Sequence, residues 1–343
     1  MKPLLNTLFV TTQGAYLSRE GLTVAVSVDE ETRVRVPIHT LNSIVCFGVV
    51  SCSPFLLQLA AEHGVAVAFC TVHGRFIARM QGPISGNVLL RRRQYAVSED
   101  TALSADIARS IVSAKIANGR VALQRASRVS ENETHTAELD FAVLRLRRIL
   151  DEIEGARDLD LIRGMEGDAA STYFSVFDHL VLTGKDSFFF RGRSRRPPLD
   201  NLNALLSFLY TLLANETVAA LECVGLDPQV GFLHRDRPGR PSLALDLMEE
   251  LRTILADRVA LSLINLQQIT TKGFRTTESG GVIMDDTTRK VVLTQWQLRK
   301  AEEIVHPFLG ERLPLGLIPY VQALLLARHL RGDLDGYPAF FWK

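Results

Sequence analysis

The sequence lacks the features that mark several common classes of protein. It has only four cysteines, Cys46, Cys52, Cys70 and Cys223, and none of them forms a C-x-x-C pair, so nothing in their spacing indicates a zinc ribbon or a dithiol redox motif. We find no run of about 18 apolar residues and no long apolar stretch near the N-terminus. We therefore expect no membrane span, no secretory signal and a cytoplasmic location with reduced thiols.

Charge of one sign is also lacking. Lys and Arg total 39 and Asp and Glu total 38, which leaves a net charge of +1. A uniform polycation is excluded, so any nucleic-acid site must come from basic residues that are grouped locally. The sequence also has no G-x-G-x-x-G after a strand, no Walker-type G-K-[ST] and no nucleophile elbow, which argues against the usual nucleotide-binding and serine-hydrolase sites.

What is present is an ordinary globular composition, 47% hydrophobic and 22% charged over 343 residues, long enough for about two domains. Residues 1–84 contain short runs with a period of two, such as Leu22–Val28, and one helix that Ser53 can cap. A Gly/Pro-rich segment at 81–87 follows, and residues 85–343 repeat apolar residues at helical spacing. The sequence predicts an α+β protein with a small N-terminal β-sandwich-like domain and a larger all-helical domain.

A helix predicted from Ser242 carries the first candidate site. Its leucines at 243, 247 and 251 form a buried stripe, while Asp246 and Glu249 are three residues apart on another face. His234 lies upstream, and a Pro/Gly turn can fold it back toward these acids. The plainer interpretation is a solvated acidic face with an unremarkable loop histidine.

A second acidic element is Glu166, which lies between Gly164 and Gly167 at the predicted start of an alanine-rich helix. The glycines permit close approach of another chain or a ligand; the alternative is an acid favoured by the helix dipole. Together Glu166, His234 and Glu249, with Asp246 alongside, would form a site of hard oxygens and one imidazole. Such a set suits Mg²⁺ or Mn²⁺, and an open ion of this kind can activate a hydroxyl or water against a phosphodiester.

Arginines gather near these segments. Because arginine forks suit phosphates, we expect the following to contact DNA, although isolated charge runs are usually solvated loops: Arg191, Arg193, Arg195, Arg196, Arg235, Arg237 and Arg240.

The chain resembles the CRISPR-associated integrase family, the first of the Cas proteins, in three stretches that occur in the expected order: "RGMEGDAASTYF", "RSRRPPLDNLNALLSFLYTLL" and "GFLHRDRPGRPSLALDLMEELR". The segment "FRTTESGGVIMDDTTRKVVL" and the tail "GYPAFFWK" look most like the type I-C branch. The resemblance implies that Glu166, His234 and Glu249 are metal ligands and that Asp246 is a neighbouring acid needed for activity. Glu249 stands where relatives often have aspartate, and Tyr210 falls near a tyrosine placed by the DNA.

The resemblance also implies the reaction and the partners. In this family a 3′-hydroxyl of a prespacer DNA attacks a phosphodiester at the leader–repeat junction. Relatives form homodimers through the β domain, and two dimers clamp a dimer of the second Cas protein. The type I-C branch further implies the fourth Cas protein, a nuclease. Two alternatives stay open: a standalone metal-dependent nuclease on branched or single-stranded DNA, and a DNA-binding scaffold whose acidic cluster is structural.

Overall fold

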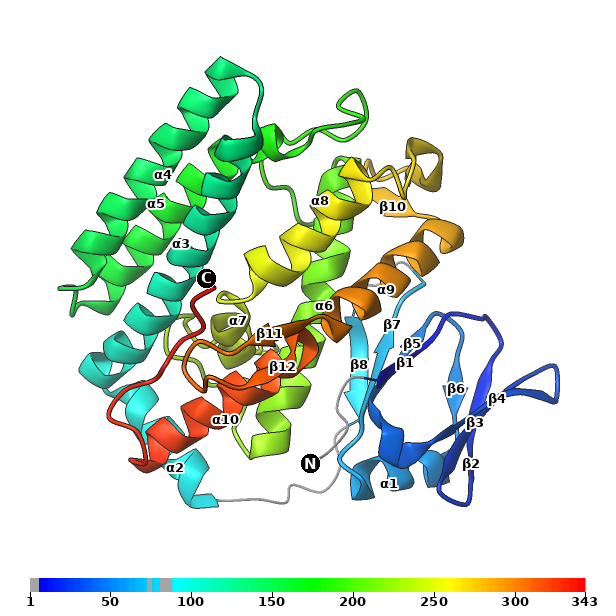
Figure 1. Ribbon diagram of the computed structural model, residues 1–343. Coiled ribbons are helices and arrows are strands. Elements are labelled where there is room, and N and C mark those ends of the chain that lie inside the picture. The colour runs from blue at the N-terminus through cyan, green and yellow to red at the C-terminus, as the bar shows by residue number, and fades with distance from the viewer. Residues whose placement is uncertain (1–5, 73–75, 81–87, 343) are drawn as a thin grey trace.

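The computed structural model describes residues 6–72, 76–80 and 88–342. A β-rich N-terminal region is followed by a mostly helical region, as Figure 1 shows. This mixed architecture confirms the fold class expected from the sequence. The predicted Gly/Pro-rich boundary at 81–87 lies outside the described residues, so the division into domains at residues 84 and 85 stays a prediction.

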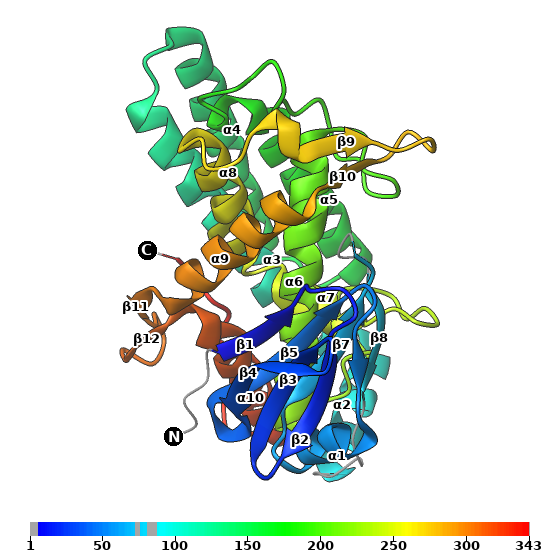
Figure 2. The same cartoon turned by 90° about the vertical axis from the view of Figure 1, so that its right-hand side faces the viewer.

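Two sheets of four strands each form the β region that the structure describes. The first sheet has the order β1 (Asn6–Val10), β5 (Leu41–Phe47), β7 (Ala66–Cys70) and β8 (Phe76–Met80), with only the last pair antiparallel. The second has the order β4 (Glu31–Pro37), β3 (Thr23–Val28), β2 (Tyr16–Glu20) and β6 (Ser51–Cys52). Figure 2 shows both sheets gathered on one side of the helical region. One apolar cluster joins the two sheets, which agrees with the predicted sandwich-like arrangement.

The strand predicted at Leu22–Val28 shows where simple alternation fails. Val24, Ala25 and Val26 are all buried in succession, while Leu22 is exposed in the turn before β3. Because Ala25 points to the face opposite Val24 and Val26, β3 is covered on both faces here, which the period of two does not predict. The helix α1 (Pro54–Glu62) follows the prediction, because the Ser53 side chain accepts a hydrogen bond from the Leu56 amide.

The helical region begins with α2 (Val88–Glu99). Its longer helices are α3 (Thr101–Val129), α4 (Glu133–Ile153), α5 (Leu159–Ser175) and α6 (Asn201–Val224). The remaining helices are α7 (Ser242–Met248), the π-helical turn η3 (Arg252–Asp257), α8 (Arg258–Asn265), α9 (Asp286–Ala301) and α10 (Ile318–Arg331). Two small hairpins pair β9 (Phe274–Thr276) with β10 (Val282–Met284) and β11 (Glu303–Val305) with β12 (Arg312–Pro314). The first of these is a hairpin that turns at Gly280.

Side-chain caps fix where the long helices begin. The carboxylates of Asp100, Asp158 and Asp200 accept backbone amides at the starts of α3, α5 and α6. Such caps satisfy amides that would otherwise have no partner inside the helix. Helices α3, α5 and α6 therefore have defined starting points, and α3, α4 and α5 pack side by side, as Figure 1 shows.

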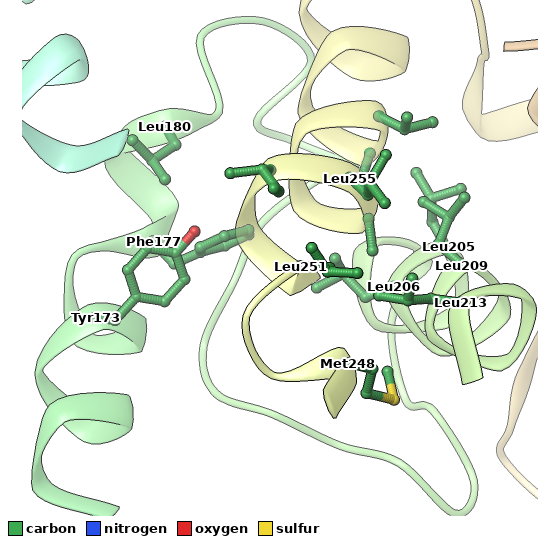
Figure 3. Packing of buried hydrophobic residues seen from close by; sticks show 14 of the residues in the cluster. Tyr173, Phe177, Leu180, Leu205, Leu206, Leu209, Leu213, Met248, Leu251 and Leu255 are labelled. Atoms are coloured by element: carbon green, nitrogen blue, oxygen red, sulfur yellow. The ribbon is translucent and has the colours of Figure 1, made fainter. Parts of the chain in front are cut away.

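Helix α6 is the centre of the helical core. Leu205, Leu209 and Leu213 on α6 face Leu251 and Leu255 of the segment that follows α7, as Figure 3 shows. Aromatic residues of α5 and its extension, Tyr173 and Phe177, belong to the same cluster. The segment that carries the candidate acids is thus held against the core by its leucine stripe.

The same helix bears on the expectation of no membrane span. By length and composition α6 is apolar enough to cross a membrane, and 67% of its most apolar window is buried inside the protein. Polar residues interrupt the helix, and two of them, Asn203 and Thr217, are fully buried. A helix buried in the core of a protein can be equally long and apolar. The packing of α6 inside the protein therefore accounts for its hydropathy.

The β region and the helical region share contacts near α6 and α9. The Gln297 amide of α9 donates to the Thr7 carbonyl of β1, and Lys300 pairs with Glu216 of α6 at 2.6 Å. Arg79 of β8 also pairs with Glu222 at 2.6 Å. These polar contacts connect the first sheet to the helices that hold the site.

Candidate functional site

The candidate acids lie on and just after α7, in a part of the chain that is buried. Helix α7 ends at Met248, and the chain then turns into the π-helical η3 instead of continuing as one α-helix. Asp246, Glu249 and Glu250 are 0%, 3% and 0% exposed. The interpretation of these acids as a solvated face is therefore wrong, because each carboxylate has partners inside the protein.

Asp246 holds the histidine loop. Its carboxylate accepts hydrogen bonds from the backbone amides of Phe232, Leu233 and His234, at 2.6 to 2.9 Å. The same carboxylate accepts Nδ1–H of the His234 ring at 2.6 Å. Nε2 is then the lone-pair nitrogen of a ring that is 22% exposed. Four donors already bind the Asp246 carboxylate, so its role in this geometry is to orient His234. Carboxylates that hydrogen-bond the second ring nitrogen of a metal-binding histidine act in the same way.

Gly231 makes this arrangement possible. A Cβ at this position would lie 2.7 Å from Oδ2 of Asp246 and 2.9 Å from the backbone carbon of Ser242. A side chain here would push the loop away from the acid that holds it. The first residue of the histidine motif is therefore part of the site, and sequence reasoning missed it.

Glu166 and Glu249 meet at one cation, Lys115 of α3. The Lys115 ammonium pairs with Oε1 of Glu166 and lies 2.7 Å from Oε2 of Glu249. Arg252 pairs with the other oxygen of Glu249 at 2.9 Å. The fold therefore brings two of the three predicted ligands to one point, and His234 is close enough to contribute to the electrostatics of Glu249.

The charges around Glu249 decide its protonation. Burial alone would raise the pKa of this carboxyl, but the positive charges of Arg252 and Lys115 outweigh burial and hold the pKa at about 2. Glu249 is thus an anion at any physiological pH. A permanently charged, buried carboxylate is what a divalent cation requires of a ligand.

Glu166 does not lie where the sequence suggested. Helix α5 begins at Leu159, so Glu166 is in its interior and the helix-dipole interpretation is wrong. Gly164 and Gly167 are exposed, and a Cβ on either would meet nothing within 4 Å. The surface beside Glu166 is therefore open, which leaves room for a ligand to approach from that side.

The residues present fit a divalent cation in charge and chemistry, with a lysine at the position between the acids. Among the described residues, no group of three or more His, Cys, Asp or Glu side chains is close enough to hold a metal. Oε2 of Glu249 is nevertheless buried without a hydrogen-bond partner of good geometry in the described part of the chain. This oxygen and Glu166 converge on the ammonium, so these two carboxylates, with Nε2 of His234, are the groups that could hold a metal beside Lys115.

The predicted DNA-contacting arginines divide into two groups. Arg191, Arg195 and Arg196 are exposed. Arg193 instead points inward, where it donates to Oδ1 of Asn203 at 2.6 Å and lies over the Tyr210 ring. Burial lowers the pKa of Arg193, so this arginine supports the loop from inside.

Tyr210 also has a partner inside the protein. Its hydroxyl donates to Asp257 at 2.6 Å, and the Tyr173 hydroxyl donates to the same carboxylate at 3.1 Å. Burial raises the pKa of Asp257 to about 6, against the lowering effect of these hydrogen bonds. Arg252 lies over the face of Tyr210 with its Cζ 5.0 Å from the ring centre. Tyr210 is therefore one layer behind Glu249, joined to it through Arg252.

The arginines that follow His234 lie on the outer side of the loop. Arg235 and Arg237 are exposed and Arg240 is half-buried. Arg235 pairs with Asp160 at the start of α5, and Arg163 joins the same acid to the loop by donating to the Leu233 carbonyl at 2.6 Å. These contacts fix the loop against α5, the helix that carries Glu166.

Two basic residues of the site were missed from the sequence. Lys115 lies in α3, where it interrupts a run of buried aliphatic residues. Arg252 is the last residue of the histidine motif and begins η3. A lone cation inside an apolar stripe is the signal that could have identified Lys115, because such a charge needs a buried partner.

The fold and this site together define a class of protein: a mixed α/β chain whose buried carboxylates and oriented imidazole suit metal-assisted chemistry on a phosphodiester. A family model described as "CRISPR associated protein Cas1" matches residues 8–298. The chain belongs to this family. A CRISPR-associated endonuclease Cas1 of Chlorobaculum tepidum is 54% identical over 343 residues, with all of both chains covered. A second, from Rhodospirillum rubrum, is 52% identical over 347 residues, again with full coverage of both. These matches over the full chain support a DNA endonuclease of CRISPR adaptation.

Solved structures agree on the fold. A casposase bound to its integration product superposes with a TM-score of 0.83 at 22% identity, covering 98% of this chain and 94% of the other. A Cas1 protein from Thermotoga maritima gives a TM-score of 0.79 at 24% identity, with 95% and 97% covered. A chain of a Cas6-RT-Cas1–Cas2 complex gives 0.82 at 22% identity, with 98% and 36% covered.

Proposed function

We propose that this endonuclease is a metal-dependent integrase, which joins the 3′-hydroxyl of a prespacer DNA end to a phosphodiester of the leader–repeat DNA. The observation that carries the proposal is the convergence of Glu166 and Glu249 on one cation, beside an imidazole oriented by Asp246. Two carboxylates and one imidazole are the ligand chemistry of Mg²⁺ or Mn²⁺ sites that act on phosphates.

Each residue has a part in this proposal. Glu166, Glu249 and Nε2 of His234 are the metal ligands, and Asp246 orients the ring and the loop that carries it. A bound Mg²⁺ or Mn²⁺ supplies Lewis-acid polarisation of the scissile phosphate and lowers the pKa of the attacking hydroxyl. Arg252 keeps Glu249 ionised, and Tyr210 and Asp257 support Arg252 from behind.

The exposed arginines give the DNA a path to the site. Arg191, Arg195 and Arg196 on one loop and Arg235, Arg237 and Arg240 on the other would contact phosphates and position the duplex without reading its sequence. The open surface at Gly164 and Gly167 would let the backbone approach Glu166. Arg193 would act indirectly, by holding its loop to α6 through Asn203.

The relatives suggest the partners. A Cas6-RT-Cas1–Cas2 complex is among the structural neighbours, and a Cas4/Cas1 fusion of Rhodospirillum rubrum is 34% identical over 336 residues. We extend this to a homodimer formed through a β domain at residues 1–84, bound to the second Cas protein and served by the fourth, in the type I-C branch and in the cytoplasm. Residues 85–343 would form the catalytic domain.

The test uses the purified chain with labelled prespacer DNA and a supercoiled plasmid that carries a repeat. Mn²⁺, Mg²⁺ and chelator are compared for the wild type and for His234→Ala, with the second Cas protein present. We expect metal-dependent joining of the labelled 3′ end, reduced by about 100-fold or more in the variant. Asn265→Ala, which removes hydrogen bonds to Leu180 and Leu182 away from the site, is the matched control and should join DNA normally.

The other outcomes separate the alternatives. Cutting without joining, lost in His234→Ala, would identify a nuclease in which water takes the place of the 3′-hydroxyl. Unchanged activity in both His234→Ala and Glu166→Ala would overturn the assignment of the site and favour a scaffold. A separate binding measurement compares Arg191→Ala/Arg195→Ala/Arg196→Ala with wild type, and an unchanged salt slope would contradict the DNA path.

A further inference from the structure

The C-terminal tail, Tyr337–Trp342, is built into the interior next to the site. It leaves the end of α10 and runs back along α3, as Figure 1 shows. Tyr337, Ala339 and Phe340 are buried although they belong to no helix or strand. A terminal segment with no secondary structure is normally poorly ordered unless something ties it down.

The first tie is Glu250, the residue after Glu249. Its fully buried carboxylate accepts the Tyr337 hydroxyl at 2.6 Å and the Phe340 amide at 2.7 Å. The side-chain amide of Gln322 on α10 completes the set at 2.9 Å. Two of the three donors to Glu250 therefore come from the tail.

The second tie is Asn118 of α3. Its side-chain nitrogen donates to the Glu250 carbonyl at 2.8 Å and to the Phe340 carbonyl at 2.9 Å. Its oxygen accepts the Trp342 amide at 2.7 Å. One buried side chain thus joins the tail, helix α3 and the turn after α7.

Glu250 and Asn118, which hold the tail, are close in the chain to Glu249 and Lys115 of the site. Glu250 follows Glu249 in the chain. Asn118 follows Lys115 by three residues, so both lie on neighbouring turns of α3. The Arg125 and Arg299 guanidiniums also lie over the Trp342 ring, with their Cζ atoms 5.8 and 5.6 Å from the ring centre. Arg299 in turn donates to the Ile254 carbonyl of η3 at 3.0 Å.

We propose that the C-terminal tail is a positioning element of the active centre, which fixes Glu249 through Glu250 and Lys115 through Asn118. Removal of the tail leaves a buried carboxylate and a buried amide without most of their partners, and such groups force the surrounding backbone to reorganise. The turn that carries Glu249 is bonded directly to both groups, so we expect it to reorganise with them. The tail's effect on metal and DNA chemistry rests on the proposed function, whereas its effect on the turn does not.

The experiment measures amide hydrogen exchange by mass spectrometry on the full-length protein and on a chain that stops after Gly336. We expect amides of residues 246–257 and 114–120 to exchange at least ten-fold faster in the shortened chain, with the β region unchanged. The dissociation constant for Mn²⁺, followed by electron paramagnetic resonance, should rise about ten-fold. Equal exchange in both chains would overturn the proposal, and so would a uniform increase across the protein.

A milder variant covers the case in which the shortened chain does not fold. Tyr337→Phe removes one hydroxyl and keeps the ring, and should raise exchange in residues 246–257 about three-fold. Thr217→Val is the matched control, because it removes a buried hydroxyl that donates to the Leu213 carbonyl within α6. If the amides of residues 246–257 are equally protected from exchange in Tyr337→Phe and Thr217→Val, the tail does not position the site.

The two proposals fail in different ways. If the wild-type protein binds no Mn²⁺ and joins no DNA, the integrase assignment is wrong. The hydrogen-exchange comparison still tests the proposal about the tail. If the wild type joins DNA and the shortened chain keeps the same Mn²⁺ affinity and the same exchange rates, only the proposal about the tail is wrong.

Discussion

Two adjacent glutamates, Glu249 and Glu250, occupy equally buried positions on opposite sides of one turn, and their surroundings differ in charge. Glu249 faces Lys115 and Arg252, and its pKa is held at about 2 in spite of its burial. Glu250 faces the neutral donors Gln322, Tyr337 and the Phe340 amide, and burial raises its pKa to about 7 against their hydrogen bonds. Burial is the same for both, so the partners alone separate the two carboxyls.

The difference assigns a task to each side of the turn. A carboxylate held as an anion by two cations can exchange one of them for a metal ion without a change in its own protonation. A carboxyl surrounded by neutral donors attracts no metal, but it can hold several chain segments at once. The side toward α5 is therefore suited to chemistry, and the side toward the tail is suited to structure.

The largest effect expected is from neutralising the acid on the cation side. Glu249→Gln leaves Lys115 and Arg252 without their buried anion, which we expect to destabilise the fold by about 3–5 kcal/mol and to lower DNA joining at least about 100-fold. Urea unfolding and the plasmid-joining assay measure the two quantities.

Glu250→Gln is the matched control on the neutral side. It removes no partner of a cation, so we expect a loss of stability of only about 1–1.5 kcal/mol at pH 7. Equal destabilisation by the two variants would show that the cations around Glu249 matter less than their geometry indicates.

A second way to sharpen the comparison is to remove the cation. Lys115→Met leaves Glu166 and Glu249 facing each other, and we expect a loss of about 3 kcal/mol in chelator that millimolar Mn²⁺ largely restores. Thermal unfolding with and without Mn²⁺ measures this recovery.

Lys300→Met is the control for that experiment. Lys300 is also buried and pairs with Glu216, which is not a predicted ligand. Its loss should be similar in chelator and should not recover with Mn²⁺. If Mn²⁺ stabilised neither variant, the position of Lys115 would not be a metal site.

The pH dependence of stability reports on the neutral side. The folded chain keeps a proton on Glu250 up to a pKa of about 7, whereas the unfolded chain releases it near the ordinary value of 4.5. The contribution of Glu250 to stability therefore falls as pH rises through this window, by at most about 3 kcal/mol. Urea unfolding of wild type and Glu250→Gln is measured at pH 5 and pH 8 in chelator. The free energy of unfolding of the variant, relative to that of the wild type, should be higher at pH 8 than at pH 5. A constant difference between the two proteins would contradict the raised pKa.

The smallest effect concerns the open surface on the cation side. Gly164→Ala places a methyl group where nothing lies within 4 Å, so we expect a gain of about 0.5–1 kcal/mol from helix propensity. DNA joining should fall if the backbone approaches this surface. Thermal unfolding and joining assays on the same sample check both, and a stabilised variant with normal joining would place the DNA elsewhere.

Much of the fold followed from residue spacing. The short strands of the N-terminal region and the Ser53 cap are where the period of two and the capping residue predicted them. Spacing failed where a residue's partner lies far away in the sequence. The burial of Glu249 depends on Lys115, 134 residues earlier, and Asn118 meets Trp342, 224 residues later. No local pattern contains such pairs.

The candidate site was predictable to a similar degree. The motifs named Glu166, His234 and Glu249, and the fold brings the two glutamates to one point. They could not show that the Asp246 carboxylate is fully occupied by Phe232, Leu233 and His234. The sequence shows only that the residue is an aspartate. Whether it binds a metal or holds a loop is decided by the hydrogen-bond donors around it, which only the structure shows.

The attachment of the histidine loop to Asp246 has a consequence for how this family can diversify. Both the backbone and the ring of His234 are hydrogen-bonded to an acid that lies beyond the turn, so the direct partners of the imidazole lie outside the segment between them. The segment from Arg235 to Arg240 is closed at its base, where Ser242 donates to the Arg235 carbonyl, and its outer residues are exposed. If this turn contacts DNA as we propose, changes of its length or charge can retune that contact while His234 stays in place.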